Sequence, residues 1–339
     1  MRVCIFLFLL VLTSCNSLTT KIDDFDIVEE ITSYDSIYSD KENPFGMITD
    51  MNIQNNVIVT SHRVDEYKYS FIDVSSGSLL TRWGKKGNAP DDFLDFGNGF
   101  ILNDSLLIFL DRMKKTINYV SYQDILNKKD SLRIIREKYP YITDFRPMQL
   151  CLVNGYKIFA GAFKDGLFGA INPHDSILNN TISYPFSVKP IEGIYRGNVF
   201  QSKIKSCSGS NRFVVQFLSS DVFEIFQIDD TIISQVATSS FSNPPVFTQV
   251  NGRYGLDYNK CIAGFMHMVV SKDLIYFLYS SLGDNDVESS NEILCFNWNG
   301  EKEKKYILPF PINIFCVDDV YIYGAREYDD ETVIYRFRL

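Results

Sequence analysis

Short runs of apolar residues recur along most of the chain, and Gly, Asn, Asp and Ser separate them. Examples that follow one another closely are "NVIVTS", "YSFIDV" and "LLTRW". Stretches with helical periodicity are nearly absent, and this pattern is typical of many short β-strands. The chain is also rich in Tyr and Phe, with 20 and 27 residues, and both favour strands. The sequence therefore predicts an all-β fold.

The runs group into six sets with a common order. The sets start near Met47, Asn98, Met148, Gln201, Ala263 and Ile312. They are about 50 residues apart, a spacing expected of propeller blades. The second run of each set is the most continuously apolar, as expected for a strand buried on both faces between neighbouring blades. We expect a six-bladed β-propeller with four-stranded antiparallel blades, formed as one domain by residues 25–339.

The sixth set holds only three strands before the chain ends at Leu339. A propeller avoids an unpaired strand edge when one terminus completes the blade that the other terminus begins. The segment "FDIVEEITSY", residues 25–34, can form a strand and is not used elsewhere. We predict that it supplies the missing strand and closes the ring. Longer insertions are expected at 121–131, with a helical turn, and at 185–200, 239–261 and 283–291.

The N-terminus has the features of an export signal. Arg2 precedes an apolar run from Val3 to Leu12, which is shorter than the roughly 20 residues of a membrane-spanning helix. The end of this run, "LTSC", resembles the lipobox of bacterial lipoproteins, and the resemblance implies cleavage before Cys15 and attachment of lipid to it. Residues 1–14 are then a signal peptide and residues 15–24 a tether. An ordinary signal peptide with an incidental cysteine is the alternative.

The formal net charge is −9, and it becomes −10 when the signal peptide is removed. An acidic chain argues against nucleic acid as a partner, because phosphates demand a basic surface. We expect no cofactor, and a monomer. The predicted location is the cell envelope, lipid-anchored either on the periplasmic face of a membrane or on the surface of the outer membrane.

The stretch "LLTRWGKKGNAPDDFLDF", residues 79–96, combines glycines and lysines as phosphate-binding loops do. A Walker loop needs GxxxxGK followed by Ser or Thr before a helix, and both the spacing and the context are wrong here. The stretch instead resembles the "G-x-G-x-G-P-x-E-F" segment of TolB-like six-bladed propeller lipoproteins of gut-associated Gram-negative bacteria. The matching positions are Gly84, Gly87, Pro90 and Phe93, with Ala89 in place of a glycine and Asp92 in place of Glu. Related NHL and TolB-type propellers are binding platforms, which the resemblance implies for this chain.

Two interpretations of this stretch remain open. In the structural one, the glycines allow positive φ, Phe93 packs between blades, and Asp91 or Asp92 accepts hydrogen bonds from backbone amides. In the other, Lys85, Lys86 and Asn88 contact a ligand. Further binding candidates lie in the long connections "IEGIYRGNVF" and "QVNGRYGLDYNK". They are Tyr195, Arg196, Arg253, Tyr254 and Tyr258, and packing of these loops over blade edges is the alternative.

Residues suited to catalysis or metal binding do not form a recognisable motif. His62, His174 and His267 fall in different blades without metal-ligand spacing, and neither HExxH nor GxSxG occurs. We expect His267 to lie in the core or line the channel. The cysteines Cys151, Cys207, Cys261, Cys295 and Cys316 stand mostly among apolar neighbours, as buried side chains do, although one disulfide is possible. We predict no metal site and no catalytic residues.

One triplet, Asp-Ser/Thr-apolar, recurs and resembles the O-glycosylation acceptor of exported proteins in the same bacterial group. Its hydroxyl residues are Ser36, Ser105, Ser131, Ser176 and Thr231. Ordinary turn chemistry before a strand gives the same pattern.

These observations favour a membrane-anchored, non-enzymatic propeller that binds a protein, a glycan or a small molecule at its loop-bearing face. The alternative is a cell-envelope enzyme, a propeller lyase or glycan hydrolase, with its site at the central channel.

Overall fold

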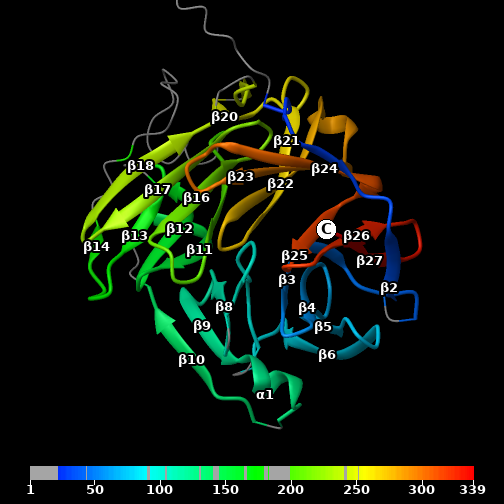
Figure 1. Cartoon of the computed structure of the whole chain (residues 1–339). Coiled ribbons are helices and arrows are strands. Elements are labelled where there is room, and N and C mark those ends of the chain that lie inside the picture. The colour runs from blue at the N-terminus through cyan, green and yellow to red at the C-terminus, as the bar shows by residue number, and fades with distance from the viewer. Residues whose placement is uncertain are drawn as a thin grey trace, which may run out of the picture.

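The computed structural model shows a six-bladed β-propeller, with the blades arranged in chain order around a common axis (Figure 1). The structure describes residues 22–42, 44–89, 92–103, 105–129, 131–139, 145–163, 166–178, 182, 199–239, 243–250 and 252–339. The four main strands of each blade pair antiparallel with their neighbours, so the predicted fold class is confirmed. No helix among these residues is both long enough and apolar enough to cross a bilayer.

Each blade has four antiparallel strands, and blade five carries a fifth. In blades one to five the first of these four strands in the sequence is the innermost, whereas in blade six the innermost is the first of its three C-terminal strands. Blade one contains β3 (Met47–Gln54), β4 (Val57–Arg63), β5 (Tyr67–Asp73) and β6 (Ser78–Lys85). Blade two contains β7 (Ile101–Leu102), β8 (Leu106–Asp111), β9 (Thr116–Ser121) and β10 (Ile134–Lys138). Blade three contains β11 (Phe145–Val153), β12 (Tyr156–Phe163), β13 (Gly169–Ile171) and β14 (Ile177–Leu178).

The second half of the ring repeats this arrangement. Blade four contains β15 (Ser202–Ser206), β16 (Arg212–Phe217), β17 (Phe223–Asp229) and β18 (Ile232–Thr238). Blade five contains β21 (Ile262–Val270), β22 (Leu274–Gly283), β23 (Ser290–Asn297) and β24 (Lys302–Ile312). Blade six contains β25 (Ile314–Val317), β26 (Tyr321–Glu327), β27 (Thr332–Arg338) and the N-terminal β2 (Tyr34–Ser39).

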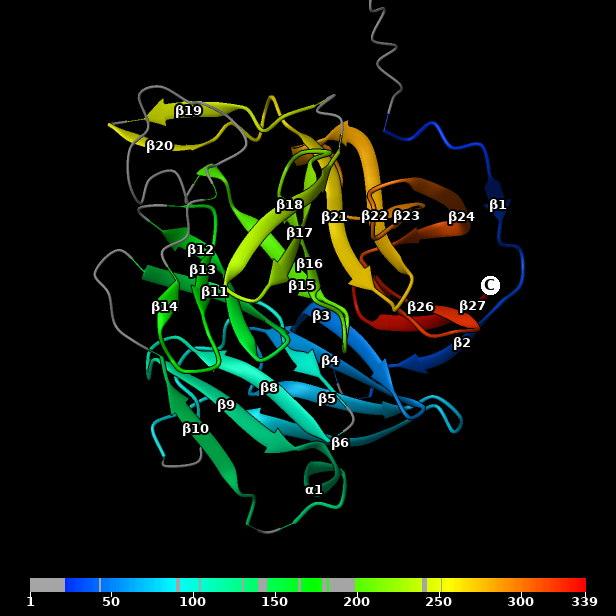
Figure 2. The same ribbon diagram turned by 60° about the vertical axis from the view of Figure 1, so that its left-hand side comes forward.

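An N-terminal strand closes the ring, but not the segment predicted from the sequence. β2 pairs antiparallel with β27, from Tyr34 opposite Phe337 to Ser39 opposite Val333. Residues 25–34 contribute only Tyr34 to this pairing. The preceding β1 (Val28–Glu30) instead pairs parallel with β24 and adds a fifth strand to blade five. Figure 2 shows the N-terminal segment passing from the outer edge of blade five to that of blade six. It therefore covers two exposed sheet edges rather than one.

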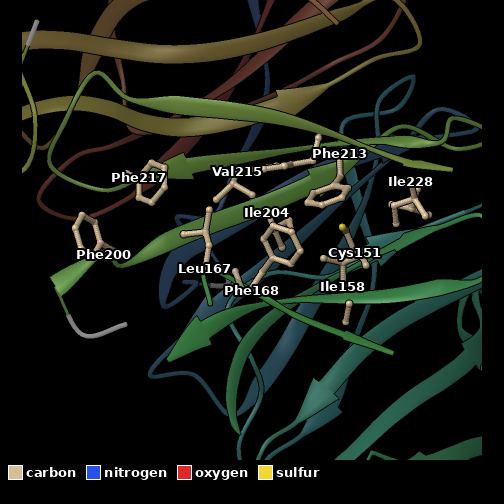
Figure 3. Close-up of a cluster of buried hydrophobic side chains, with 14 of the residues drawn as sticks. Cys151, Ile158, Leu167, Phe168, Phe200, Ile204, Phe213, Val215, Phe217 and Ile228 are labelled. Atoms are coloured by element: carbon tan, nitrogen blue, oxygen red, sulfur yellow. The ribbon is translucent and has the colours of Figure 1, made fainter. Parts of the chain in front are cut away.

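The core consists of apolar side chains packed between adjacent blades. Figure 3 shows the cluster between blades three and four, where Ile158 and Phe168 face Phe213 and Ile204. The second strands β4, β8 and β16 are buried almost throughout, and β22 is buried over 275–280, as the sequence predicted. All five cysteines outside the N-terminal segment are free, and Cys207 is the least buried.

The insertions carry small elements of their own. The predicted helical turn is α1 (Tyr122–Leu126), capped by the Ser121 hydroxyl, which accepts from the Asp124 amide at 3.2 Å. Within 239–261 a hairpin of β19 (Phe247–Val250) and β20 (Arg253–Leu256) extends from the ring. The insertion at 283–291 contains the short 3₁₀-helix η1 (Asp284–Asp286). Of the insertion at 185–200, only its last two residues fall within the described part of the chain.

Candidate functional site

A large concave basin opens at the end of the channel where the inner strands begin. Its volume is about 1240 Å³. The basin is lined by the first residues of β3, β11 and β15, the last residues of β4 and β12, and the connection from blade one to blade two. Loops and strand ends of this kind place side chains on a rigid scaffold, which is where propellers and other all-β folds carry binding sites. This basin is the candidate site.

The most buried polar contact of the basin centres on Asp50 of β3. Its Oδ1 accepts from the Lys205 ammonium at 2.9 Å and from the Met51 amide at 3.0 Å, and lies 3.4 Å from Nε2 of His267. Its Oδ2 accepts from the Phe100 amide at 3.2 Å. Burial alone would raise the pKa of Asp50, but the Lys205 charge and the His267 hydrogen bond outweigh burial and hold the pKa well below its usual range.

This contact joins four blades, because each of its members lies on an inner strand or just before one. Asp50 is on blade one, Phe100 precedes β7 of blade two, Lys205 is on blade four and His267 on blade five. Gly99, which has φ +90°, lets the chain pass close to the carboxylate: an added Cβ would lie 2.7 Å from Oδ2 of Asp50. Backbone this close, at a positive φ, requires glycine.

Two lysines on the basin wall are partly buried without an ion pair among the described residues. Lys68 donates to the His62 carbonyl at 3.0 Å, and its ammonium lies 5.7 Å from the centre of the Phe96 ring. Lys203 donates to the Met266 carbonyl at 2.9 Å. Burial, the largest cause in each case, lowers the pKa of Lys68 and of Lys203 to about 8. Both wall lysines are therefore costly to keep charged and respond to any anion brought near them.

The two basin histidines are held neutral. Burial lowers the pKa of His62 and of His267 to about 4. Nδ1 of His62 lies 3.2 Å from the Gly46 carbonyl, which can only accept, so Nδ1 carries the proton and Nε2 accepts from the Thr60 and Ser70 hydroxyls at 2.9 and 3.0 Å. The expectation that His267 lies in the core or the channel is confirmed, because it is 3% exposed and lines the basin.

Positive charge predominates around the basin, although the whole chain is acidic. The basic lining residues are Arg63, Lys68, Lys86, Arg112, Arg146, Lys203 and Lys205, and the acidic ones are Asp50, Asp65 and Asp95. All three carboxylates are already paired with cations: Asp50 with Lys205, Asp65 with Arg82, and Asp95 with Arg112 at 2.8 Å. Three of the cations, namely Arg63, Lys86 and Arg146, are exposed and form no ion pair within the part of the chain that the structure describes.

The glycine-rich stretch 79–96 forms a tight crossing from blade one to blade two. Gly84 has φ +84°, as predicted, whereas Gly87 does not have a positive φ. Gly87 is needed for a different reason, because an added Cβ would lie 2.2 Å from the Asp92 carboxylate. That carboxylate accepts from the Ala89 amide at 3.2 Å, and Phe93 is 1% exposed between Trp83 and Phe109.

The predicted ligand contacts of this stretch separate in the structure. Lys86 lines the basin, whereas Lys85 pairs with Glu66 at 3.1 Å and Asn88 is exposed outside the basin lining. Pro90 and Asp91 lie outside the described residues, as do Cys15, Tyr195 and Arg196. The stretch therefore both shapes the crossing and gives one cation to the basin.

The second predicted recognition surface lies on the β19–β20 hairpin. Arg253 begins β20, and Tyr254 packs against the apolar cluster between blades three and four, which favours the alternative of loop packing for this side chain. Tyr258 is exposed, at 44%. Neither tyrosine lines the basin.

The remaining predicted residues lie at the surface. His174 is exposed in the turn between β13 and β14. The hydroxyl residues Ser36, Ser105, Ser131, Ser176 and Thr231 are all exposed. Ser36 lies within β2 rather than in a turn, which corrects the expectation of turn chemistry there, because the ring-closing pairing needs that segment extended. Within the described ranges, no three His, Cys, Asp or Glu side chains gather as metal ligands would.

Most of the basin residues were missed from the sequence. Lys203 and Lys205 flank the buried Ile204 in "SKIKS", and this alternation on an inner strand could have indicated side chains that face the channel. Asp50 in "MITDMNI" has no such signal, because its partners Lys205 and His267 are far away in the sequence. Arg63 and Arg146 stand at strand ends, where charged residues are ordinary.

The fold and the site define the class of the protein: a single-ring propeller with a basic basin at one mouth of its channel. A family model, "TolB-like 6-blade propeller-like", matches residues 25–320, and the chain belongs to this family. The resemblance of the 79–96 stretch to TolB-like propellers is thereby confirmed.

Solved structures share the fold at low sequence identity. A protein of Bacteroides fragilis NCTC 9343 described as exported has a TM-score of 0.55 at 10% identity, over 92% of this chain and 98% of its own. A member of the DUF4221 family from Bacteroides vulgatus ATCC 8482 has a TM-score of 0.56 at 10% identity, over 91% and 97%. A luciferin-regenerating enzyme has a TM-score of 0.50 at 10% identity, over 91% and 95%. No curated protein matches the chain significantly. At such identities the likeness shows the fold alone.

Proposed function

We propose that this protein is a lipid-anchored propeller of the cell envelope that binds a small ligand in the basin without transforming it. The observation that carries the proposal is the basin itself. Its volume of about 1240 Å³ is ample for a small ligand, and seven cationic and three anionic side chains line it. Pockets that bind ligands are concave, largely preformed and few in a protein.

The chemistry of the basin favours binding. Its carboxylates are paired with cations. The Lys205 charge and the His267 hydrogen bond lower the pKa of Asp50, and hydrogen bonds from the Gly46 and Tyr67 amides, with the Arg82 charge, lower that of Asp65, so both groups stay ionised and serve as fixed anions. A general acid would need a raised pKa instead. The histidines stay neutral near pH 7 because burial lowers their pKa, and His62 is fully occupied by hydrogen bonds to its neighbours. Because these side chains are already held by their neighbours, less conformational entropy is lost when a ligand binds.

Export and anchoring rest on the N-terminal sequence. The short apolar run after Arg2 and the lipobox-like "LTSC" support cleavage before Cys15 and lipid attachment there. The described fold begins at Ile22, which leaves a short tether between the lipid and the ring. The family relationship supports the envelope as the location, since a structural relative is described as exported.

One observation favours the enzymatic alternative, a lyase or glycan hydrolase. Lys203 sits on the basin wall with its pKa lowered to about 8 by burial, which is the range of a lysine that acts as a general base. A lyase would use such a base to remove a proton from a substrate bound by the neighbouring cations.

A basin-filling variant tests where binding occurs. Asn98 is exposed and lines the basin, so Asn98→Trp places a large ring in the basin and obstructs it without disturbing the core. Ile232→Trp, at an exposed position of 69% on outer strand β18, is the matched control. Full-length protein in detergent is screened by thermal unfolding against neutral, anionic and cationic small molecules. We expect at least one class to stabilise the wild type and the control but not Asn98→Trp. Equal stabilisation of all three proteins would show that the basin is not the site, and turnover of the ligand would identify an enzyme.

Cell fractionation tests the anchor separately. Cys15→Ala removes the sulfur that would carry the lipid, and the variant should leave the membrane fraction and lose the mass of the acyl chains. Each buried CH₂ contributes about 0.8 kcal/mol to membrane binding, so loss of the chains releases the protein. Retention of the variant in the membrane would refute lipidation at Cys15.

A further inference from the structure

We propose that the ligand of the basin is a small molecule that carries two or more anionic groups, either carboxylates or phosphates. The inference rests on the proposed binding function and adds the chemical class of the ligand. It depends on the uncompensated charge of the basin, on the arrangement of that charge over several blades, and on the state of the two wall lysines.

The charge of the basin is not balanced by the protein. Seven cations and three carboxylates line it, and each of the three carboxylates already has a cationic partner. Five cations therefore remain without a carboxylate partner among the described residues: Arg63, Lys68, Lys86, Arg146 and Lys203. The formal charge of the whole chain is −9, so this concentration of positive charge is local. A concave site lined by one sign of charge attracts ligands of the opposite sign and raises their rate of association.

The free cations are distributed around the mouth rather than clustered at one point. Arg63 ends β4 of blade one, Lys86 follows β6, Arg146 is near the start of β11 of blade three, and Lys203 is on β15 of blade four. A ligand with one negative charge balances one of these cations and leaves the others without an anionic partner. A basin of about 1240 Å³ accommodates a ligand of several rings or linked groups, with acidic groups that meet separate cations.

The arginines and lysines fit different parts of such a ligand. Arg63 and Arg146 are exposed at the rim, and a guanidinium recognises a carboxylate or phosphate through two parallel hydrogen bonds. Lys68 and Lys203 lie deeper, and among the described residues each donates to a carbonyl group. Within that part of the chain neither ammonium group forms an ion pair, and a ligand would bring the missing anion.

Binding of an anion at the wall lysines is coupled to protonation. Lys68 faces Asp50, Asp95, Arg63 and Arg112, while Lys203 faces Asp50 and Lys205. Their pKa values of about 8 mean that both are charged below pH 8 and lose the proton above it. An anionic ligand favours the charged form and raises both pKa values, so binding near that pH takes up protons.

Calorimetric titration of the full-length protein in detergent tests the ligand class. The probes are trigalacturonate, with three carboxylates, and its neutral counterpart maltotriose. Tripolyphosphate is a third probe and distinguishes a phosphate ligand from a sugar acid. We expect at least one of the two anions to bind, with affinity that falls as salt or pH rises, and no binding of maltotriose. Titration of the protein with the anion that binds, repeated in buffers of different ionisation enthalpy, should show that binding takes up protons at about pH 8.

Matched charge variants localise the effect. Arg63→Gln/Arg146→Gln removes two exposed rim cations, and neither has an ion pair among the described residues that folding would lose. Lys272→Gln/Arg338→Gln removes two exposed cations outside the basin and makes the same change in net charge. The basin variant should bind the anion at least tenfold more weakly, and the control should bind it as the wild type does.

Three results would overturn the inference. Equal loss of affinity in both double variants would show attraction to the overall charge rather than to the basin. Binding of neither anion to the wild type would show that the cations do not form an anion site. Binding of maltotriose, or of another neutral molecule, that Asn98→Trp abolishes would leave the proposed binding function intact but reject the anionic ligand class.

Discussion

Replacement of Asp50 by Asn is the most direct test of how the basin is built. The variant keeps the size of the side chain and removes its charge. It leaves the Lys205 ammonium, whose side chain is 14% exposed, without its partner at 2.9 Å. The Asp50 side chain itself is 4% exposed, so water replaces only part of the lost interaction. Removal of one member of a buried ion pair costs about 3 to 5 kcal/mol, chiefly because the other charge stays buried and unpaired.

The loss should appear in thermal and urea unfolding followed by the fluorescence of Trp83 and Trp298, the two tryptophans of the chain. Because the entropy of unfolding is roughly 2.1 cal/mol/K per residue, a loss of this size lowers Tm by about 4 to 7 °C in a chain of this length. Asp319→Asn, at an exposed turn position, is the matched control and should change the free energy of unfolding by less than about 0.5 kcal/mol.

A double-mutant cycle separates the ion pair from the other contacts of Asp50. Lys205→Met removes the cation but leaves its aliphatic volume, and the double variant Asp50→Asn/Lys205→Met leaves no unpaired charge. We expect the double variant to lose at least about 1.5 kcal/mol less than the sum of the two single variants. Additive losses, or a cost below about 1 kcal/mol for Asp50→Asn, would refute the view that this pair joins the blades across the channel.

Three further predictions concern closure, acid sensitivity and the contact between blades. Asp40→Ala should lower the free energy of unfolding by about 3 kcal/mol in urea titrations. The buried Asp40 carboxylate lies beside the closing strand and accepts from the Thr332 amide at 2.6 Å and from the Phe45 amide at 2.8 Å. A loss below about 1 kcal/mol would contradict that role. The depressed pKa values of His62 and His267, about 4 against 6.5, mean that their contribution to stability is complete above pH 6.5 and is lost as the pH falls toward 4. His267→Gln should therefore reduce the loss of unfolding free energy between about pH 6.5 and pH 5 by about 2 kcal/mol, and an unchanged pH profile would show that His267 is not buried neutral. Gly264→Ala should lower the free energy of unfolding, measured by urea titration, by about 2 to 5 kcal/mol. The φ of Gly264 is +58°, and an added Cβ would lie 1.9 Å from the Ser220 carbonyl of the neighbouring blade. A free energy of unfolding equal to that of the wild type would show that the blades can shift apart there.

The pattern of short apolar runs was sufficient to predict the architecture. A strand buried on both faces must be continuously apolar, and "LLIFLD" and "RFVVQF" could not remain stable as exposed segments. Repetition at a near-constant spacing then fixed the number of blades. The need for a closing strand also followed from the sequence, because the last set lacks a member and an open sheet edge is unfavourable.

The identity of the closing strand required the structure. Both Val28–Glu30 and Tyr34–Ser39 can form strands, and local preference does not say which sheet edge each one covers. Register decided it: Tyr34 packs against Phe310 and Phe337 only when the segment that follows it pairs with the last strand. The predicted strand 25–34 ended where the observed closing strand begins.

The sequence by itself determined the strands, the blade count and an overall negative charge, because each of these follows from the order or the number of residues along the chain. The tertiary structure alone decided where positive charge gathers. Arg63, Arg146 and Lys203 are far apart in the sequence. They line one basin only because the fold brings the strand ends of three blades around one axis. Coulomb interactions depend on distance in space and on local burial. An acidic chain can for that reason carry a basic basin that its composition conceals.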